Sequence, residues 1–191
     1  DVAIAYERHD GGRGLLAIEL KYSETMNDAP APSLAQYDGL ADASGLYKEP
    51  SHAHLRVGGL QQLFREHLLT QSTLMNGEYD EAYFVVIAPR HNHLVERVSE
   101  LYWAHLAQPL DGVAAFRFIE LEQVIDAIAR AGDLDYACAL HDRYSDWSKV
   151  DTAVEQALAQ STDRWSLKPP ASNRLALVTS QSLSSLSRGG T

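Results

Sequence analysis

Residues 14–22 read GLLAIELKY, an apolar segment that carries one acid and one base two positions apart. Side chains alternate between the two faces of a β-strand, so Glu19 and Lys21 share one face while Ile18 and Leu20 share the other. Burying a carboxylate and an ammonium group in so apolar a strand is costly unless they are paired or bind something. The segment therefore predicts a strand with a polar, functional face.

A second strand is predicted at residues 1–6, DVAIAY, and residues 9–14, HDGGRG, have the composition of a turn between the two strands. Folding this hairpin brings Asp1 near Lys21, at the same end of the sheet as Glu19. Two carboxylates and a lysine at one place suit a divalent metal ion with a cationic partner. The alternative is a Glu–Lys ion pair on a solvated face, which contributes about 0 to 1 kcal/mol.

The order of an Asp, about twenty residues, and then Glu-Xaa-Lys across a hairpin resembles the core of the PD-(D/E)XK nuclease superfamily, which has the restriction-endonuclease-like fold. Residues 18–24, IELKYSE, are most similar to a bacterial branch of uncharacterised restriction-type nucleases. The resemblance extends over about residues 1–150. Further segments similar to that branch are QLFREHLL at 62–69, FVVIAP at 84–89 and RYSDW at 143–147.

This resemblance implies a metal-dependent nuclease that hydrolyses phosphodiester bonds of DNA. In that scheme Asp1 and Glu19 hold Mg²⁺ or Mn²⁺, and Lys21 acts on the attacking water. Hard divalent ions prefer oxygen ligands of this kind. Nucleases that cut both strands are often dimers, so a homodimer is one arrangement that the resemblance allows.

The helix that follows supplies two further candidates, Gln62 and Arg65, which are three residues apart and so lie near one helix face. In the nucleases that the chain resembles, a glutamine on this helix reaches back to the active site, and Gln62 is the matching position. Gln61 competes for the same role. Arg65 is expected to contact a phosphate of the nucleic acid, because its planar guanidinium suits that geometry.

The order of strands and helices predicts an α/β (α+β) fold, with a mixed central sheet flanked by helices. The chain begins at Asp1 inside a predicted strand, so we expect the restriction-endonuclease-like core to be N-terminally truncated. The expected domains are a nuclease core at 1–161 and a disordered tail at 162–191, which is rich in Ser and Pro. The expected elements between them are a long loop at 25–53, helices at 55–75, 93–106, 121–131 and 134–144, and strands at 82–89 and 116–119.

The charge balance qualifies the nuclease hypothesis. Asp and Glu outnumber Lys and Arg by 26 to 16, which gives a net charge of −10, whereas nucleic-acid binding usually requires a basic face. This favours a second hypothesis, a catalytically inactive nuclease-fold module for protein or nucleic-acid interaction. A third is another metal-dependent enzyme that uses the same carboxylates on a small substrate.

Two further features bear on location and metals. A single cysteine, Cys138, fits the reducing cytoplasm, and no run of residues is long and apolar enough to suggest a membrane partner. The pairs His52/His54 and His91/His93 have the spacing of zinc ligands. Neither pair is expected to bind a metal, because one lies in a predicted loop, the other at a helix start, and no cysteine is nearby.

Overall fold

The computed structural model describes residues 1–26, 35–108 and 111–166. The chain divides into two compact units, Asp1–Asp146 and Trp147–Thr191, and each is described by itself. The first unit contains the sheet, its helices and every residue proposed above for the active site.

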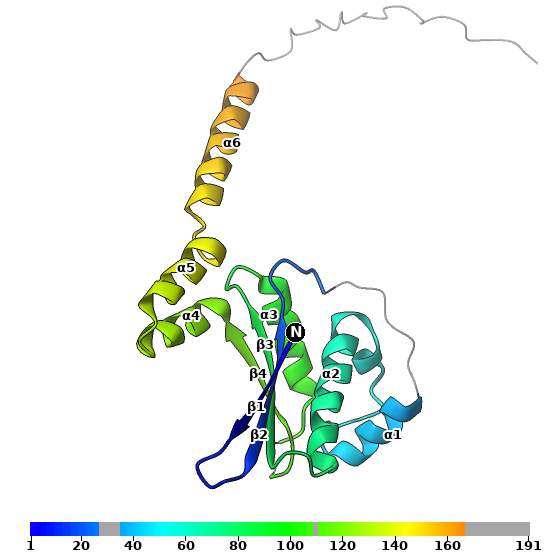
Figure 1. Ribbon diagram of the computed structural model, residues 1–191. Helices are drawn as coiled ribbons and strands as arrows, with labels where there is room; N and C mark the ends of the chain where they lie inside the picture. The colour runs from blue at the N-terminus through cyan, green and yellow to red at the C-terminus, as the bar shows by residue number, and fades with distance from the viewer. Residues whose placement is uncertain (27–34, 109–110, 167–191) are drawn as a thin grey trace, which may run out of the picture. The chain divides into compact units, whose positions relative to one another are not determined.

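Four strands form one sheet in the order β1-β2-β3-β4 (Figure 1). β1 pairs with β2 in the antiparallel sense, while β2 with β3 and β3 with β4 are parallel. The predicted mixed sheet flanked by helices is therefore confirmed. The strands are β1 (Val2–Glu7), β2 (Arg13–Leu20), β3 (Glu81–Ala88) and β4 (Ala115–Glu120).

The helices connect the parallel strands, as the parallel pairing requires. The connection from β2 to β3 contains α1, η1 and the long α2, and the connection from β3 to β4 contains α3. Each parallel pair is therefore joined by a helical crossover. The helical elements are α1 (Ala35–Ser44), η1 (Ala53–Arg56, a 3₁₀ turn), α2 (Gly58–Met75), α3 (His93–His105), α4 (Leu121–Arg130), α5 (Leu134–Tyr144) and α6 (Ser148–Ser166).

The predicted loop at 25–53 is wrong over much of its length, because it contains α1 and the first residue of η1. α1 is only ten residues long, and its inward face combines the half-buried Tyr37 and Leu40 with the small Ala41 and Ser44, so its apolar spacing is a weak signal. Residues 27–34, where Pro30 and Pro32 stand, lie outside the described residues.

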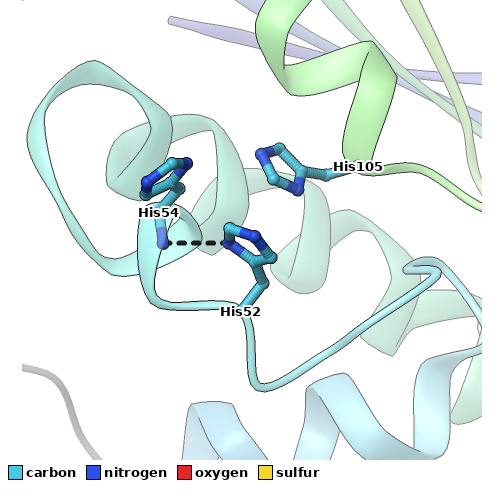
Figure 2. Close-up of side chains that lie close together, drawn as sticks. All are labelled: His52, His54 and His105. Carbon is cyan, nitrogen blue, oxygen red and sulfur yellow. Dashed lines mark hydrogen bonds between the residues drawn. The ribbon is translucent and has the colours of Figure 1, made fainter.

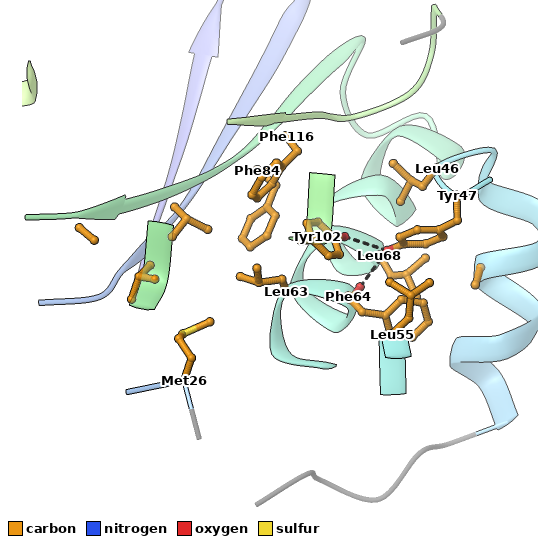
Figure 3. Close-up of a cluster of buried hydrophobic side chains, with 14 residues drawn as sticks. Met26, Leu46, Tyr47, Leu55, Leu63, Phe64, Leu68, Phe84, Tyr102 and Phe116 are labelled. Atoms are coloured by element: carbon orange, nitrogen blue, oxygen red, sulfur yellow. Dashed lines mark hydrogen bonds between the residues drawn. The ribbon is translucent and has the colours of Figure 1, made fainter. Parts of the chain in front are cut away.

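A single large core lies between the sheet and the helices α2 and α3 (Figure 3). β3 is the central strand of this packing: alternate residues Phe84, Val86 and Ala88 face the core and are almost completely buried. The predicted strand buried on both faces is confirmed, since the intervening Val85 and Ile87 are also buried. The opposing helices contribute Leu63, Phe64 and Leu68 of α2 and Val95 and Tyr102 of α3.

The β1–β2 hairpin depends on one close contact. A side chain at Gly14 would collide with the ring of Tyr6, its partner in the register. The Tyr6 hydroxyl donates a 2.6 Å hydrogen bond to Glu81, which begins β3. Glycine at position 14 therefore lets the Tyr6 ring cross β2 and join the edge strand to the centre of the sheet.

The second unit contains α6, which extends from Ser148 to Ser166. Residues 167–191, most of the predicted tail, lie outside the described residues. Across the ranges that the structure describes, no helix is long and apolar enough to cross a membrane.

Candidate active site

Glu19 and Lys21 stand at the carboxyl end of β2, on the face that packs against α2. In the parallel register Glu19 lies beside the fully buried Val86. The Lys21 backbone N–H donates to the carbonyl of Ile87 at 2.9 Å, which continues the β2–β3 pairing past the last residue of the strand. The backbone at both residues is therefore fixed by regular sheet hydrogen bonds, which sets the direction of the two side chains.

The two side chains form a buried ion pair. Lys21 Nζ lies 2.6 Å from Glu19 Oε1, and the two residues are only 6% and 3% exposed. The solvated-face alternative is therefore wrong. A buried pair of this kind carries a desolvation cost that often equals or exceeds its attraction, so stability alone is a poor explanation for its presence.

α2 brings Gln62 to this pair. The Gln62 side-chain amide donates to Glu19 Oε1 at 2.7 Å and to Glu66 Oε1 at 2.8 Å. It thus bridges a carboxylate on the sheet to a carboxylate on the helix. Of the two glutamines considered from the sequence, Gln62 is the one that reaches Glu19.

Glu66 is the most unusual member of this cluster, which we call the carboxylate cluster (Glu19, Lys21, Gln62 and Glu66). Its second oxygen, Oε2, is buried and has no hydrogen-bond partner within the described residues. Burial raises the pKa of Glu66, against the opposing effects of the Gln62 hydrogen bond, the nearby charges of Lys21 and Arg65, and the N-terminal ammonium group. A buried oxygen without a partner, next to a second carboxylate, is what a cation site requires.

Asp1 lies beside the cluster rather than within its hydrogen bonds. Val2 pairs with Ile18, so Asp1 stands across from Glu19. From the sequence, Asp1 is expected near Lys21, which lies two positions beyond Glu19. Residues opposite one another in an antiparallel pair direct their side chains to the same face. Asp1 is exposed, and its side chain makes no hydrogen bond to the rest of the described chain.

Arg65 is placed differently from Gln62, although the two are one helical turn apart. Its guanidinium lies 5.5 Å from the centre of the Tyr37 ring, on α1. Its Nε atom is buried and finds no hydrogen-bond partner in the described part of the chain. Arg65 therefore lies against α1, and its Nε is a donor without a partner among the described residues.

The family model of the PD-(D/E)XK nuclease superfamily matches the sequence over residues 1–146. The chain belongs to this superfamily. The match spans the whole first compact unit, and the restriction-endonuclease-like fold is in agreement with the mixed sheet. No curated protein and no solved structure shows a significant match.

Membership of the PD-(D/E)XK superfamily implies a divalent metal. The ligand type present suits one, but the carboxylate oxygens of Asp1, Glu19 and Glu66 do not lie within 4.8 Å of one another in the metal-free chain, so binding requires these side chains to move together. Glu19, Glu66 and Asp1 offer carboxylate oxygens, the ligand type that Mg²⁺ and Mn²⁺ prefer. Oε2 of Glu66 is a buried oxygen that receives no hydrogen bond from the described residues. Lys21 and Gln62 already occupy Glu19 Oε1, which leaves the other oxygen of Glu19 for a cation.

Glu66 is not among the candidates predicted from the sequence, although it lies within residues 62–69. The available signal is the spacing of Gln62 and Glu66, four residues apart and hence on one helix face. In the structure these two side chains are hydrogen-bonded to each other, and Gln62 also reaches Glu19 on β2.

Proposed function

We propose that this protein is a metal-dependent nuclease that hydrolyses phosphodiester bonds of DNA. The observation that carries the proposal is the bridge from the buried Lys21–Glu19 pair through Gln62 to the unsatisfied carboxylate of Glu66. Buried charges are retained where they act on something. In a chain of the PD-(D/E)XK superfamily, that action is on a phosphodiester.

Asp1 and Glu19 are the proposed ligands of Mg²⁺ or Mn²⁺, with Glu66 as an additional carboxylate. When bound, the ion neutralises charge on the phosphate oxygens and lowers the pKa of bound water. The three residues come from the position before β1, from β2 and from α2, so the folded chain is needed to assemble them.

Lys21 is the proposed catalytic cation. Its ammonium group has three donors, of which the bond to Glu19 uses one. The remaining donors can orient the attacking water and stabilise the negative charge that develops on phosphorus-bound oxygen. Because Lys21 and Glu19 are almost fully buried, each electrostatic contact is stronger than it would be in water.

Gln62 is proposed to position the site, since its amide holds both carboxylates in place. Arg65 is proposed to bind a phosphate of the nucleic acid beside Tyr37. The Tyr37 ring supports its guanidinium from one side and leaves the planar edge for a phosphate.

The net charge of −10 favours one other candidate, a catalytically inactive nuclease-fold module that binds protein or nucleic acid. An acidic chain lacks the broad basic surface on which most DNA affinity depends. The two candidates differ in whether the carboxylate cluster binds metal and cleaves.

The test compares the wild-type chain with Lys21→Met and with Lys149→Met, a matched change of an exposed lysine on α6. Supercoiled plasmid and single-stranded DNA are incubated with Mg²⁺ or Mn²⁺, with and without EDTA. We expect cleavage to disappear in EDTA, to fall about 10²- to 10³-fold in Lys21→Met, and to be unchanged in Lys149→Met.

Lys21→Met leaves Glu19 without its cation, so the thermal unfolding of each variant is measured alongside. The double variant Glu19→Gln, Lys21→Met removes both charges and is expected to fold without restoring cleavage. Cleavage that survives in a folded Lys21→Met protein would contradict the assigned role of Lys21. A folded wild type with neither cleavage nor metal binding would support the inactive module instead.

A further inference from the structure

Three histidines from two distant parts of the sequence, none of them in the carboxylate cluster, meet on the first unit. His52 caps η1, His54 lies within it, and His105 is the last residue of α3. Figure 2 shows their rings turned toward a common point. Each offers a ring nitrogen, and these nitrogens all lie within 4.8 Å of one another. Within the described residues, no other group of three His, Cys, Asp or Glu side chains brings its ligand atoms so close together.

We propose that His52, His54 and His105 bind a divalent transition-metal ion of the zinc class, at a second metal site independent of the carboxylate cluster. Neutral imidazole is a preferred ligand of Zn²⁺, Co²⁺, Ni²⁺ and Cu²⁺, whereas Mg²⁺ prefers oxygen. The two sites therefore select different metals by ligand chemistry alone.

The size of the triad suits one ion. Zn–N bonds of about 2.0 to 2.1 Å place the nitrogens of a tetrahedral site roughly 3.3 Å apart. The ring centre of His52 lies 4.7 Å from that of His54 and 4.5 Å from that of His105, and the ring centres of His54 and His105 lie 6.1 Å apart. Small rotations of exposed or half-buried rings close the remaining gap, and three histidines leave the fourth position to water.

The backbone on both sides of the triad is already fixed. The backbone N–H of Lys48 donates to the His105 carbonyl at 3.0 Å, and its side chain donates to the Ala104 carbonyl at 2.8 Å. Together these bonds hold the segment before η1 against the end of α3. Leu55, inside η1, is fully buried. Metal binding would therefore join two anchored segments and need not order a loop.

Histidine ligates metals through a neutral ring nitrogen, and the other nitrogen then carries the proton. His52 Nδ1 accepts a 3.2 Å hydrogen bond from the His54 backbone N–H, so ligation through Nε2 requires only a tautomer change and the loss of that one bond.

The test uses the untagged full chain, stripped of metal, with Zn²⁺ titrated against a chromophoric chelator and Co²⁺ binding followed by visible absorption. We expect one equivalent of Zn²⁺ to bind, the tetrahedral Co²⁺ bands to appear, and the thermal midpoint to rise with Zn²⁺. His105→Ala is expected to weaken Zn²⁺ binding at least about 100-fold, since even indirect supporting groups contribute 10- to 100-fold.

His54→Ala, at an exposed position, is the second variant and is expected to have the same effect should His105→Ala not fold. Two controls separate the sites: His93→Ala, which alters the other His-Xaa-His pair, and Glu19→Gln, which alters the carboxylate cluster. Both are expected to retain Zn²⁺ binding. A wild type that takes up no Zn²⁺, or equal binding in His54→Ala, would overturn the proposal.

Discussion

α2 carries polar side chains to the interior at two places, and the two places differ in how well their hydrogen bonds are satisfied. Around His67, every polar atom of the ring has a partner. Around Gln62 and Glu66, a buried carboxylate oxygen has none within the described residues. Because both clusters lie on one helix, we infer that the difference in hydrogen bonding reflects a difference in role between the two clusters.

The His67 cluster is a completed network. His67 Nδ1 lies 2.9 Å from the Tyr102 hydroxyl and Nε2 lies 2.9 Å from the Ala114 carbonyl. The Tyr47 hydroxyl lies 3.0 Å from that of Tyr102 and donates to the Phe64 carbonyl at 3.3 Å (Figure 3). Burial lowers the pKa of His67 to about 4, so the ring is neutral and the whole network carries no charge.

The carboxylate cluster has the opposite character. It combines two acids with one lysine, and one oxygen of Glu66 receives no hydrogen bond from the part of the chain that the structure describes. Satisfied buried networks specify a unique core, whereas partly satisfied charged ones destabilise the fold. We infer that the His67 cluster serves stability and that the carboxylate cluster is kept for binding.

The largest effect is expected from Tyr102→Phe, which removes the central hydroxyl of the His67 cluster. His67 and Tyr47 both lose a partner, so the free energy of unfolding should fall by about 3 kcal/mol. Urea unfolding followed by circular dichroism measures this. DNA cleavage below the unfolding transition should be unchanged. A loss of cleavage in the folded variant would contradict the assignment of the His67 cluster to stability alone.

The next effect is a pH dependence of stability from His67. Its folded pKa of about 4 lies below the unfolded value of about 6.5, so the unfolded state binds more protons and stability is lost as the pH falls from about 6.5 toward 4. The expected loss between pH 8 and pH 5 is about 2 kcal/mol.

The check is urea unfolding at both pH values for the wild type and for His67→Gln, which cannot titrate there. The difference in unfolding free energy between the two proteins should shrink by that amount at pH 5. An equal pH dependence in both would mean that His67 titrates normally in the fold.

The smallest effect, opposite in sign, is expected from Glu66→Gln. Because burial raises the pKa of Glu66, its charged form is disfavoured in the fold, and a neutral amide should stabilise the metal-free protein by about 1 kcal/mol at pH 7. Differential scanning calorimetry in EDTA measures this. Destabilisation would indicate that Glu66 acts as a structural partner like His67.

Much of this architecture follows from local sequence pattern. Alternation in residues 14–22 predicted the strand and the shared face of Glu19 and Lys21, and a continuous apolar run predicted β3. These signals are strong because the segments are buried and strongly patterned. The resemblance to the superfamily supplied Gln62, which the structure places against Glu19.

Other features depend on tertiary contacts that local pattern does not contain. α1 was missed because it is short and only Tyr37 and Leu40 on its inward face are large. Glu66 was missed because its burial results from the packing of α2 on β2, not from its own type. The meeting of His105 with His52 and His54 requires the end of α3 to lie against the segment before η1, a contact between residues far apart in the sequence.

The most direct test of the central claim is Mn²⁺ binding to the carboxylate cluster, measured by electron paramagnetic resonance on metal-free wild type, Glu19→Gln and Tyr102→Phe. The account predicts that wild type and Tyr102→Phe bind Mn²⁺ alike, and that Glu19→Gln binds at least about tenfold more weakly. Unchanged binding in a folded Glu19→Gln protein would contradict the claim that the carboxylate cluster is a metal site.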